Sequence, residues 1–155
     1  MENKYYTPEI SEFHVGFEYD TILESNDWGQ IPKELEGSWH RCIQSEEDFI
    51  NYYEASSNLS DKLSSNKIRI KYLDQEDIES LGFKQDKDKV YRIIINDVEY
   101  VLLPLSFTNT NTIQIFRIDR YDTGTSRNVT LFIGNIKNKS ELVRLLKQLE
   151  ITIDK

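Results

Sequence analysis

The most regular hydrophobic pattern in the chain lies at its C-terminal end. Its apolar positions are spaced three and four residues apart and comprise Leu142, Leu145, Leu146 and Leu149. This spacing places them on one face of an amphipathic helix. Asn138 and Glu141 stand where the N-cap and the third residue of a capping box belong. The pattern therefore predicts a helix over 138–149 whose leucine face packs against the strands before it.

Four strand-like segments precede this helix. They span residues 90–96, 98–105, 112–119 and 129–133, and they are rich in Ile, Val, Leu, Tyr and Phe. Asn96-Asp97 is a good turn pair between the first two segments. In the third, the alternation slips between Ile115 and Phe116, which predicts a bulge or a strand buried on both faces. We therefore expect an α+β fold: an antiparallel meander of about four to six strands with a C-terminal amphipathic helix and one or two further short helices.

The first half of the chain carries shorter patterns. They predict a strand over 38–44, a helix from Ser45 to about Ala55, a Ser- and Asn-rich loop over 56–66, a half-exposed strand over 67–72, and a short helix capped by Asp74 and ended by Gly82. For a chain of 155 residues, we expect one domain over 1–155 that buries roughly 70% of the surface exposed in the unfolded chain. Within it, 67–155 is the expected sheet-plus-helix core, and the 56–66 loop is the best internal boundary.

The N-terminal segment is unusually aromatic and alternates with a period of two. The positions on one face are Phe13, Val15, Phe17 and Tyr19. Such alternation predicts an extended strand. Two interpretations remain open for residues 1–22: an ordinary edge strand of the domain, or a docking segment that adds a strand to a partner's sheet and places these four side chains in its pockets.

The composition of the chain indicates its cellular compartment and limits the classes of partner. Cys42 is the single cysteine, so an internal disulfide framework is excluded and a reducing cytosol is expected. The start of the chain lacks the pattern of a secretory signal, and no apolar run has the length of a membrane span. The net charge is −8, and the first 66 residues hold 4 Lys/Arg against 14 Asp/Glu. An acidic surface repels phosphate, which disfavours nucleic acid as a partner.

Candidate chemistry is sparse. The two histidines, His14 and His40, have no flanking motif that would pair them with Cys42 as a nucleophile, and the short His40-Arg41-Cys42 run is too small a ligand set for zinc. No metal or other cofactor is therefore expected. These observations leave an enzymatic role open but favour a non-enzymatic protein.

One cationic cluster is a candidate ligand site. Arg117, Arg120 and Arg127 lie at or near the turn between two predicted strands, among Thr and Ser hydroxyls. Guanidinium groups with hydroxyls can bind a phosphate or carboxylate. The alternative is a basic hairpin tip neutralised by Asp119 and Asp122.

Three segments also resemble a known group of proteins. They are YYTPEISEFHVGFEY at 5–19, KIRIKYLDQEDIESLGF at 67–83 and LFIGNIKNKSELVRLLKQL at 131–149. These segments are similar to uncharacterised small proteins of Bacteroidota phages and prophages. The resemblance implies a phage-type accessory protein of the bacterial cytoplasm or the virion, and it carries no catalytic residue.

Two functional hypotheses follow. The first is a phage- or prophage-encoded, non-enzymatic module that binds a phage or host protein through the N-terminal segment. The second is a small anionic-ligand-binding, sequestering protein, or a small enzyme, that uses the arginine-rich hairpin.

Overall fold

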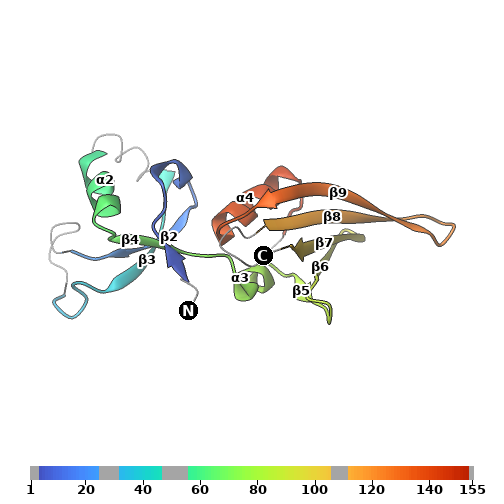
Figure 1. Cartoon of the computed structure of the whole chain (residues 1–155), viewed down its shortest axis with the longest axis horizontal. Helices are drawn as coiled ribbons and strands as arrows, with labels where there is room; N and C mark the ends of the chain where they lie inside the picture. The colour runs from blue at the N-terminus through green and yellow to red at the C-terminus, as the bar shows by residue number, and fades with distance from the viewer. Residues whose placement is uncertain (1–3, 25–31, 47–55, 106–111, 154–155) are drawn as a thin grey trace. The chain divides into compact units, whose positions relative to one another are not determined.

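The computed structural model describes residues 4–24, 32–46, 56–105, 112–153. The chain divides into two compact units, residues 1–72 and 73–155, and each is built around its own antiparallel sheet (Figure 1). The expected core began at residue 67, whereas the second unit begins at Leu73. The reason is that the strand after residue 67 pairs inside the first unit. Whether the whole chain behaves as one domain stays a prediction.

The first unit holds a four-stranded sheet. Its strands are β1 (Tyr5–Tyr6), β2 (Glu18–Ile22), β3 (Trp39–Ile43) and β4 (Ile68–Lys71), in the order β1-β4-β2-β3. A 3-10 turn, η1 (Ile10–Glu12), follows β1, and helix α2 (Ser56–Ser64) precedes β4. One face of the sheet is packed against a small core. That core consists of Phe13, Phe17, Ile68 and Ile70, with Tyr6, Tyr19 and Leu63 at its margin.

Two predictions for this unit are corrected. Residues 13–17 are not a strand, because Gly16 has a φ of +82° and Phe17 N donates to His14 O in a turn. The expected loop over 56–66 is mostly helix α2, because Leu63 anchors this Ser-rich segment on the core. The predicted strand over 38–44 is confirmed as β3. The helix predicted from Ser45 to Ala55 falls largely on residues outside the described part of the chain.

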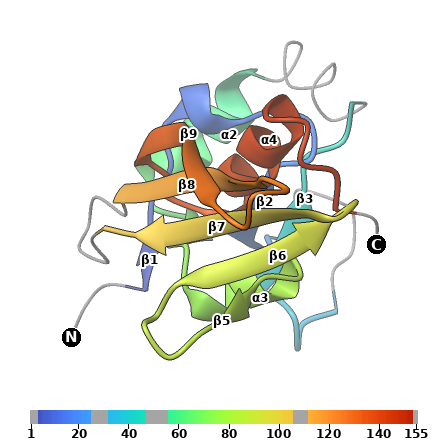
Figure 2. The ribbon, with the colours of Figure 1, turned by 90° about the vertical axis from the view of Figure 1, so that its right-hand side faces the viewer.

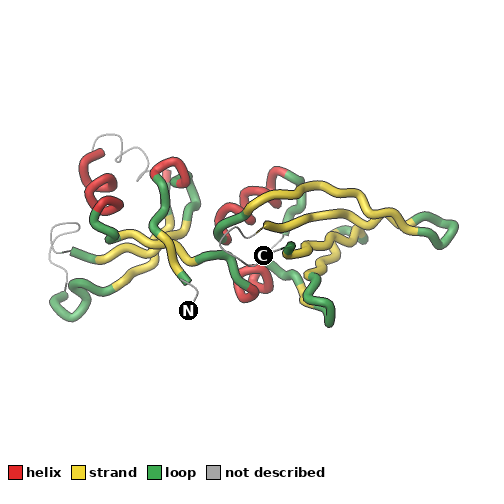
Figure 3. Tube along the Cα trace, in the orientation of Figure 1, coloured by secondary structure: helices red, strands yellow, loops and turns green. Residues whose placement is uncertain are grey.

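The second unit is the predicted meander, and the α+β fold class is confirmed. Its sheet runs in chain order through β5 (Lys84–Gln85), β6 (Tyr91–Ile95), β7 (Val98–Pro104), β8 (Thr112–Arg120) and β9 (Ser126–Asn135). Figure 2 shows β6, β7 and β8 lying side by side. Two helices complete the unit, α3 (Gln75–Ser80) and α4 (Lys139–Gln148). Figure 3 distinguishes helices, strands and loops along the chain.

Short sequence patterns predicted a turn and an irregularity in this sheet. Asn96 and Asp97 both have positive φ, at 49° and 63°, and form the two-residue turn between β6 and β7. The slip seen near Ile115 is a real irregularity, since Ile115 pairs with Phe132 and Phe116 with Thr130. Leu131 is thus the extra residue, and the bulge lies on β9 rather than on β8.

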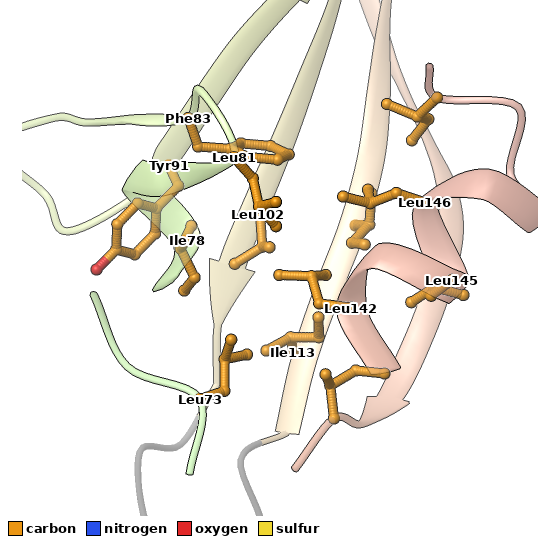
Figure 4. Packing of buried hydrophobic residues seen from close by; sticks show 13 residues of the cluster. Leu73, Ile78, Leu81, Phe83, Tyr91, Leu102, Ile113, Leu142, Leu145 and Leu146 are labelled. Atoms are coloured by element: carbon orange, nitrogen blue, oxygen red, sulfur yellow. The ribbon is translucent and has the colours of Figure 1, made fainter. Parts of the chain in front are cut away.

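Both helices of the second unit pack on one face of its sheet (Figure 4). Tyr91, Leu102, Ile113 and Ile115 come from the sheet, Ile78 from α3, and Leu142, Leu145 and Leu146 from α4. Asn138 caps α4 as predicted, because its Oδ1 accepts from Glu141 N at 2.9 Å. Glu141 Oε2 accepts from Lys137 N at 2.7 Å, one residue before the amide that a capping box would use. The predicted leucine stripe is therefore the helical half of this core.

Candidate functional site

The outer face of the first sheet, opposite its core, carries a cluster of charged and aromatic side chains. Side chains alternate between the two faces of each strand, and Ile68 and Ile70 point to the core. Arg69, between them, therefore lies on the outer face. Asp20 on β2 is the register partner of both Arg69 on β4 and Arg41 on β3. Neighbouring strands thus bring three charged residues together on this face.

Two aromatic rings hold Arg69 in place. Its guanidinium carbon lies 4.1 Å from the centroid of the Tyr5 ring and 4.0 Å from that of the Trp39 ring. Tyr5 comes from the edge strand β1 and Trp39 from the opposite edge strand β3. Such cation–π contacts contribute about 0.5–1 kcal/mol each at exposed sites. All three side chains are half-buried, so each still presents part of its surface to solvent.

Asp20 is shared by two guanidinium groups. Its Oδ1 lies 3.4 Å from Arg41 Nε and its Oδ2 lies 3.5 Å from Arg69 Nε. The carboxylate is largely covered, with 13% of its side chain exposed, whereas the Arg41 side chain is 62% exposed. One carboxylate therefore faces two cations, and the more exposed cation is Arg41.

Ile43 extends this cluster along β3. It alternates with Cys42 and so follows Trp39 and Arg41 on the outer face, where it is 62% exposed. We call this set the aromatic–arginine surface. It consists of Tyr5, Asp20, Trp39, Arg41, Ile43 and Arg69. Trp, Tyr and Arg are the residue types that carry most binding energy at protein interfaces, and a guanidinium can bind a carboxylate through two parallel hydrogen bonds.

The four aromatic and apolar residues predicted to bind a partner do not share one face. Phe13 and Phe17 are buried, and the Phe13 ring packs edge-on against the rings of Phe17 and Tyr19 at 5.0 and 5.4 Å. Val15 is 52% exposed at the tip of the turn. Tyr19 belongs to β2, which lies inside the sheet between β4 and β3. The edge strand of this segment is instead β1, at Tyr5–Tyr6.

The three arginines of the predicted anion site lie on the β8–β9 hairpin but on different faces of it. Asp119 is the register partner of Arg127, so Arg117, Asp119 and Arg127 point to one face, while Arg120 points to the other. The pairing of β8 with β7 ends at Ile118, and the tip of the hairpin continues beyond β7 (Figure 1). Strand geometry therefore does not gather the three guanidinium groups around one ligand.

Carboxylates already occupy two of these arginines. Arg117 Nε and Nη2 donate to the two oxygens of Asp119 at 2.6 and 3.1 Å. The hydrogen bonds between the two side chains lower the pKa of Asp119 and raise the pKa of Arg117. Arg120 Nη2 donates to Glu99 Oε2 at 2.6 Å. The pairing with Asp119 matches the neutralised hairpin that the sequence left open as the alternative.

Glu99 belongs to a longer line of charges across the second sheet. Arg92 donates to Asp86 Oδ2 at 3.0 Å and to Glu99 Oε1 at 2.9 Å. Hydrogen bonding to Arg92 lowers the pKa of Asp86 and of Glu99. The same bonds, chiefly that to Asp86, raise the pKa of Arg92. The line Asp86–Arg92–Glu99–Arg120 alternates in sign and ties β6, β7 and β8 together.

The residues considered for nucleophilic or metal chemistry are His14, His40 and Cys42. His40 Nε2 lies 2.7 Å from Ser38 Oγ, and His14 Nδ1 lies 2.9 Å from Val15 O. Cys42 is half-buried and follows His40 on the same side of β3. Within the described ranges, no three His, Cys, Asp or Glu residues are grouped so that they could hold a metal ion. In the same ranges, no helix has the length and apolar character needed to cross a membrane.

No family model, no curated protein and no solved structure matches this chain.

The sequence contained part of the signal for the aromatic–arginine surface. Trp39, Arg41 and Ile43 alternate with Ser38, His40 and Cys42, which groups them on one face of a strand. The sequence does not reveal that β1 and β4 are neighbours, or that β2 separates β4 from β3. Tyr5, Arg69 and Trp39 could therefore not be joined before the strand order was known.

Proposed function

We propose that this protein is a phage- or prophage-encoded accessory protein that acts, without catalysis, by binding a phage or host protein. The proposed binding site is the aromatic–arginine surface, and the place of action is the bacterial cytoplasm or the virion. The observation that carries the proposal is the position of Arg69 between the Tyr5 and Trp39 rings at 4.1 and 4.0 Å. This arrangement orders three hot-spot side chains before any partner arrives, so binding costs less conformational entropy.

The chemistry of the surface indicates the chemistry of the partner. The outer face of the sheet carries three cations, Arg41, Arg69 and Lys71, against two carboxylates, Asp20 and Glu18. Exposed Ile43 lies on the same face, directly opposite Glu18. A protein segment that carries a carboxylate next to an apolar side chain complements both features. Residues 1–72 hold 7 Lys/Arg and 14 Asp/Glu, and this net negative charge opposes a polyanion such as nucleic acid more strongly than a segment with a single carboxylate. The proposed partner is therefore a protein segment that presents one carboxylate beside an apolar side chain, rather than a nucleic acid.

The arginine-rich hairpin supports the second hypothesis less well. An anionic ligand would have to displace Asp119 from Arg117 and Glu99 from Arg120. It would also reach only part of the set at once, because Arg120 points to the opposite face from Arg117 and Arg127. Binding of a small anion at this hairpin is the alternative against which the proposal is tested.

The test compares charge and apolar variants at matched exposed positions. The full-length chain, tagged, is purified from phage-infected host cells together with its bound proteins, which are quantified by mass spectrometry. Arg41→Glu and Ile43→Ser alter the aromatic–arginine surface, and Arg127→Glu and Ile94→Ser make the same changes on exposed positions of the second unit. Far-ultraviolet circular dichroism and thermal melting verify that all four variants fold.

The proposal expects a protein that is recovered with the unaltered chain and both control variants, but not with Arg41→Glu or Ile43→Ser. Affinity for that purified partner should fall at least about tenfold with Arg41→Glu, which corresponds to roughly 1.4 kcal/mol. Recovery of the same proteins with all variants would overturn the proposal. Loss of recovery with Arg127→Glu alone would move the binding site to the hairpin.

A further inference from the structure

The two edges of the second sheet differ sharply in how they are protected. One edge is β5, which has two residues and is followed by the charged run Asp86-Lys87-Asp88-Lys89. The other edge is β9, which has ten residues. Its sequence, SRNVTLFIGN, contains no proline and a single charged residue, Arg127. Short strands, charged side chains and proline usually protect a sheet edge from pairing with another chain. Strand β9 is long, has no proline and carries one charge, so it has little of this protection.

The outer side of β9 presents unused backbone groups. In an edge strand, alternate residues direct their N–H and C=O groups away from the sheet. Residues 126–135 are all described, and their backbone groups make no hydrogen bond apart from those of the ladder with β8. Ile133 on this strand is 60% exposed. The edge therefore offers both main-chain groups and apolar surface to an added strand.

We propose that β9 pairs antiparallel with β9 of a second copy of this chain, so that the two five-stranded sheets join across a two-fold axis. This proposal concerns the second unit and goes beyond the proposed partner-binding function of the first.

The bulge at Leu131 makes the strand complementary to itself. In the register that overlaps the whole strand, Arg127 lies opposite Gly134 of the other copy, and Val129 lies opposite Phe132. All four are on the face that packs on the helices, because their partners on β8 are Asp119, Ile113, Arg117 and Ile115. Asn128 lies opposite Ile133, and their β8 partners, Ile118 and Gln114, share the other face.

This matching of faces depends on the extra residue. In a regular strand, residues of opposite parity point to opposite faces, so a register that pairs 127 with 134 would bring the two faces into conflict. Leu131 shifts the alternation by one position halfway along the strand. The two residues of each pair named above then point to the same side of the joined sheet.

The charge of the strand is compatible with self-pairing. Arg127 of each copy faces Gly134 of the other, and these positions are seven residues apart along the strand. Because Leu131 is an extra residue, they span six ladder positions, so the two guanidinium groups are separated by about 20 Å at 3.3 Å per position, well beyond the Debye length of ~8 Å at physiological salt. A second copy therefore brings no like-charge contact to this edge, and the matched faces together with this absence of repulsion point to a second copy as the occupant.

The first experiment measures mass as a function of concentration. Light scattering after gel filtration should show the full-length chain changing from 18.3 kDa to twice that mass as its concentration rises. Thr130→Lys places two like charges near the two-fold axis, and it should weaken the dimer at least about tenfold. Ile94→Lys adds the same charge on β6, on the opposite side of the sheet from β9, at a residue 68% exposed, and should leave the dimer unchanged.

A second experiment tests the register. In a Cys42→Ala background, Asn128→Cys in one preparation and Ile133→Cys in another should form a disulfide-linked dimer when mixed and oxidised, because directly opposite Cα atoms lie within disulfide range. Neither preparation alone should cross-link efficiently. A chain that stays at 18.3 kDa at every concentration overturns the proposal, and so does a dimer that Thr130→Lys leaves intact. Loss of this dimer would not alter the recovery of a partner through the aromatic–arginine surface, so the two proposals fail separately.

Discussion

Arg120 on β8 donates from Nη2 to Oε2 of Glu99 on β7 at 2.6 Å. The other oxygen of Glu99 accepts from Arg92 at 2.9 Å, so one carboxylate binds two guanidinium groups from the strands on either side of it. The Glu99 side chain is largely covered, while three quarters of the Arg120 side chain is exposed. Arg120, a candidate ligand-binding residue in the sequence, is thus paired with a carboxylate on the neighbouring strand.

Removing the charge of Glu99 should destabilise the second unit in a pH-dependent way. Glu99→Gln is expected to lower the free energy of unfolding by on the order of 1 kcal/mol at neutral pH, because two charge-assisted hydrogen bonds weaken. The pKa of Glu99 is lowered in the folded protein, chiefly by the hydrogen bond from Arg92. The ion pairs are therefore fully effective above the pKa of an unfolded Glu, about 4.3, and their contribution is lost as pH falls through the lowered value.

Urea denaturation at neutral pH and at about pH 3 measures this effect. The difference between the unaltered chain and Glu99→Gln should shrink at the lower pH. Asp122→Asn, at an exposed residue of the hairpin loop, is the control and should change the free energy of unfolding little at either pH. A difference for Glu99→Gln that is independent of pH would contradict the ionic explanation.

Gly16 should be sensitive to any side chain. Its φ is +82° and its N–H donates to Gln44 O at 2.8 Å, while an added Cβ would meet no atom within 4 Å. The cost of Gly16→Ala is therefore one of backbone conformation, about 1–2 kcal/mol. Gly16→Asn should cost less, since Asn tolerates left-handed backbone better. Thermal melting of both variants tests this order, and equal losses would mean that the turn does not need positive φ.

Gln44 is a buried polar side chain. It is 1% exposed, and neither its Nε2 nor its Oε1 has a hydrogen-bond partner in the part of the chain that the structure describes. Replacing it with a chain of similar shape, Gln44→Met, should raise the free energy of unfolding by about 1 kcal/mol, because the unpaired amide no longer has to be desolvated. Gln44→Glu should lower it by several kcal/mol. If chemical denaturation shows that Gln44→Met is destabilising, the amide is bound to water in solution.

The N-cap of α4 should be worth a measurable amount of stability. Asn138 is 2% exposed and its Oδ1 accepts from Glu141 N at 2.9 Å. Asn138→Ala should cost about 1 kcal/mol because the amide of Glu141 loses its partner. Asn138→Ser keeps an acceptor oxygen and should recover most of that loss. Hydrogen exchange of the first turn of α4 reports the effect locally, and unchanged protection with Ala would refute the capping role.

Features that depend on neighbours in sequence were predictable. The leucine stripe of α4, its Asn138 cap and the Asn96-Asp97 turn each involve residues within a few positions of one another, and the structure contains all three. The strands joined by short turns also followed the expected meander order. Errors arose where tertiary packing overrides local composition, as in the Ser-rich helix α2, which is held by Leu63.

The sequence by itself determined which residues share a face of one helix or one strand, because those periods are properties of the local backbone. It also determined the fold class. Only the tertiary structure decided that β4 joins the first sheet, that Arg69 lies between Tyr5 and Trp39, and that Arg120 faces away from Arg117. The physical reason is that strand order and register arise from contacts between segments far apart in the chain, and alternation within a strand carries no record of which strand will lie beside it.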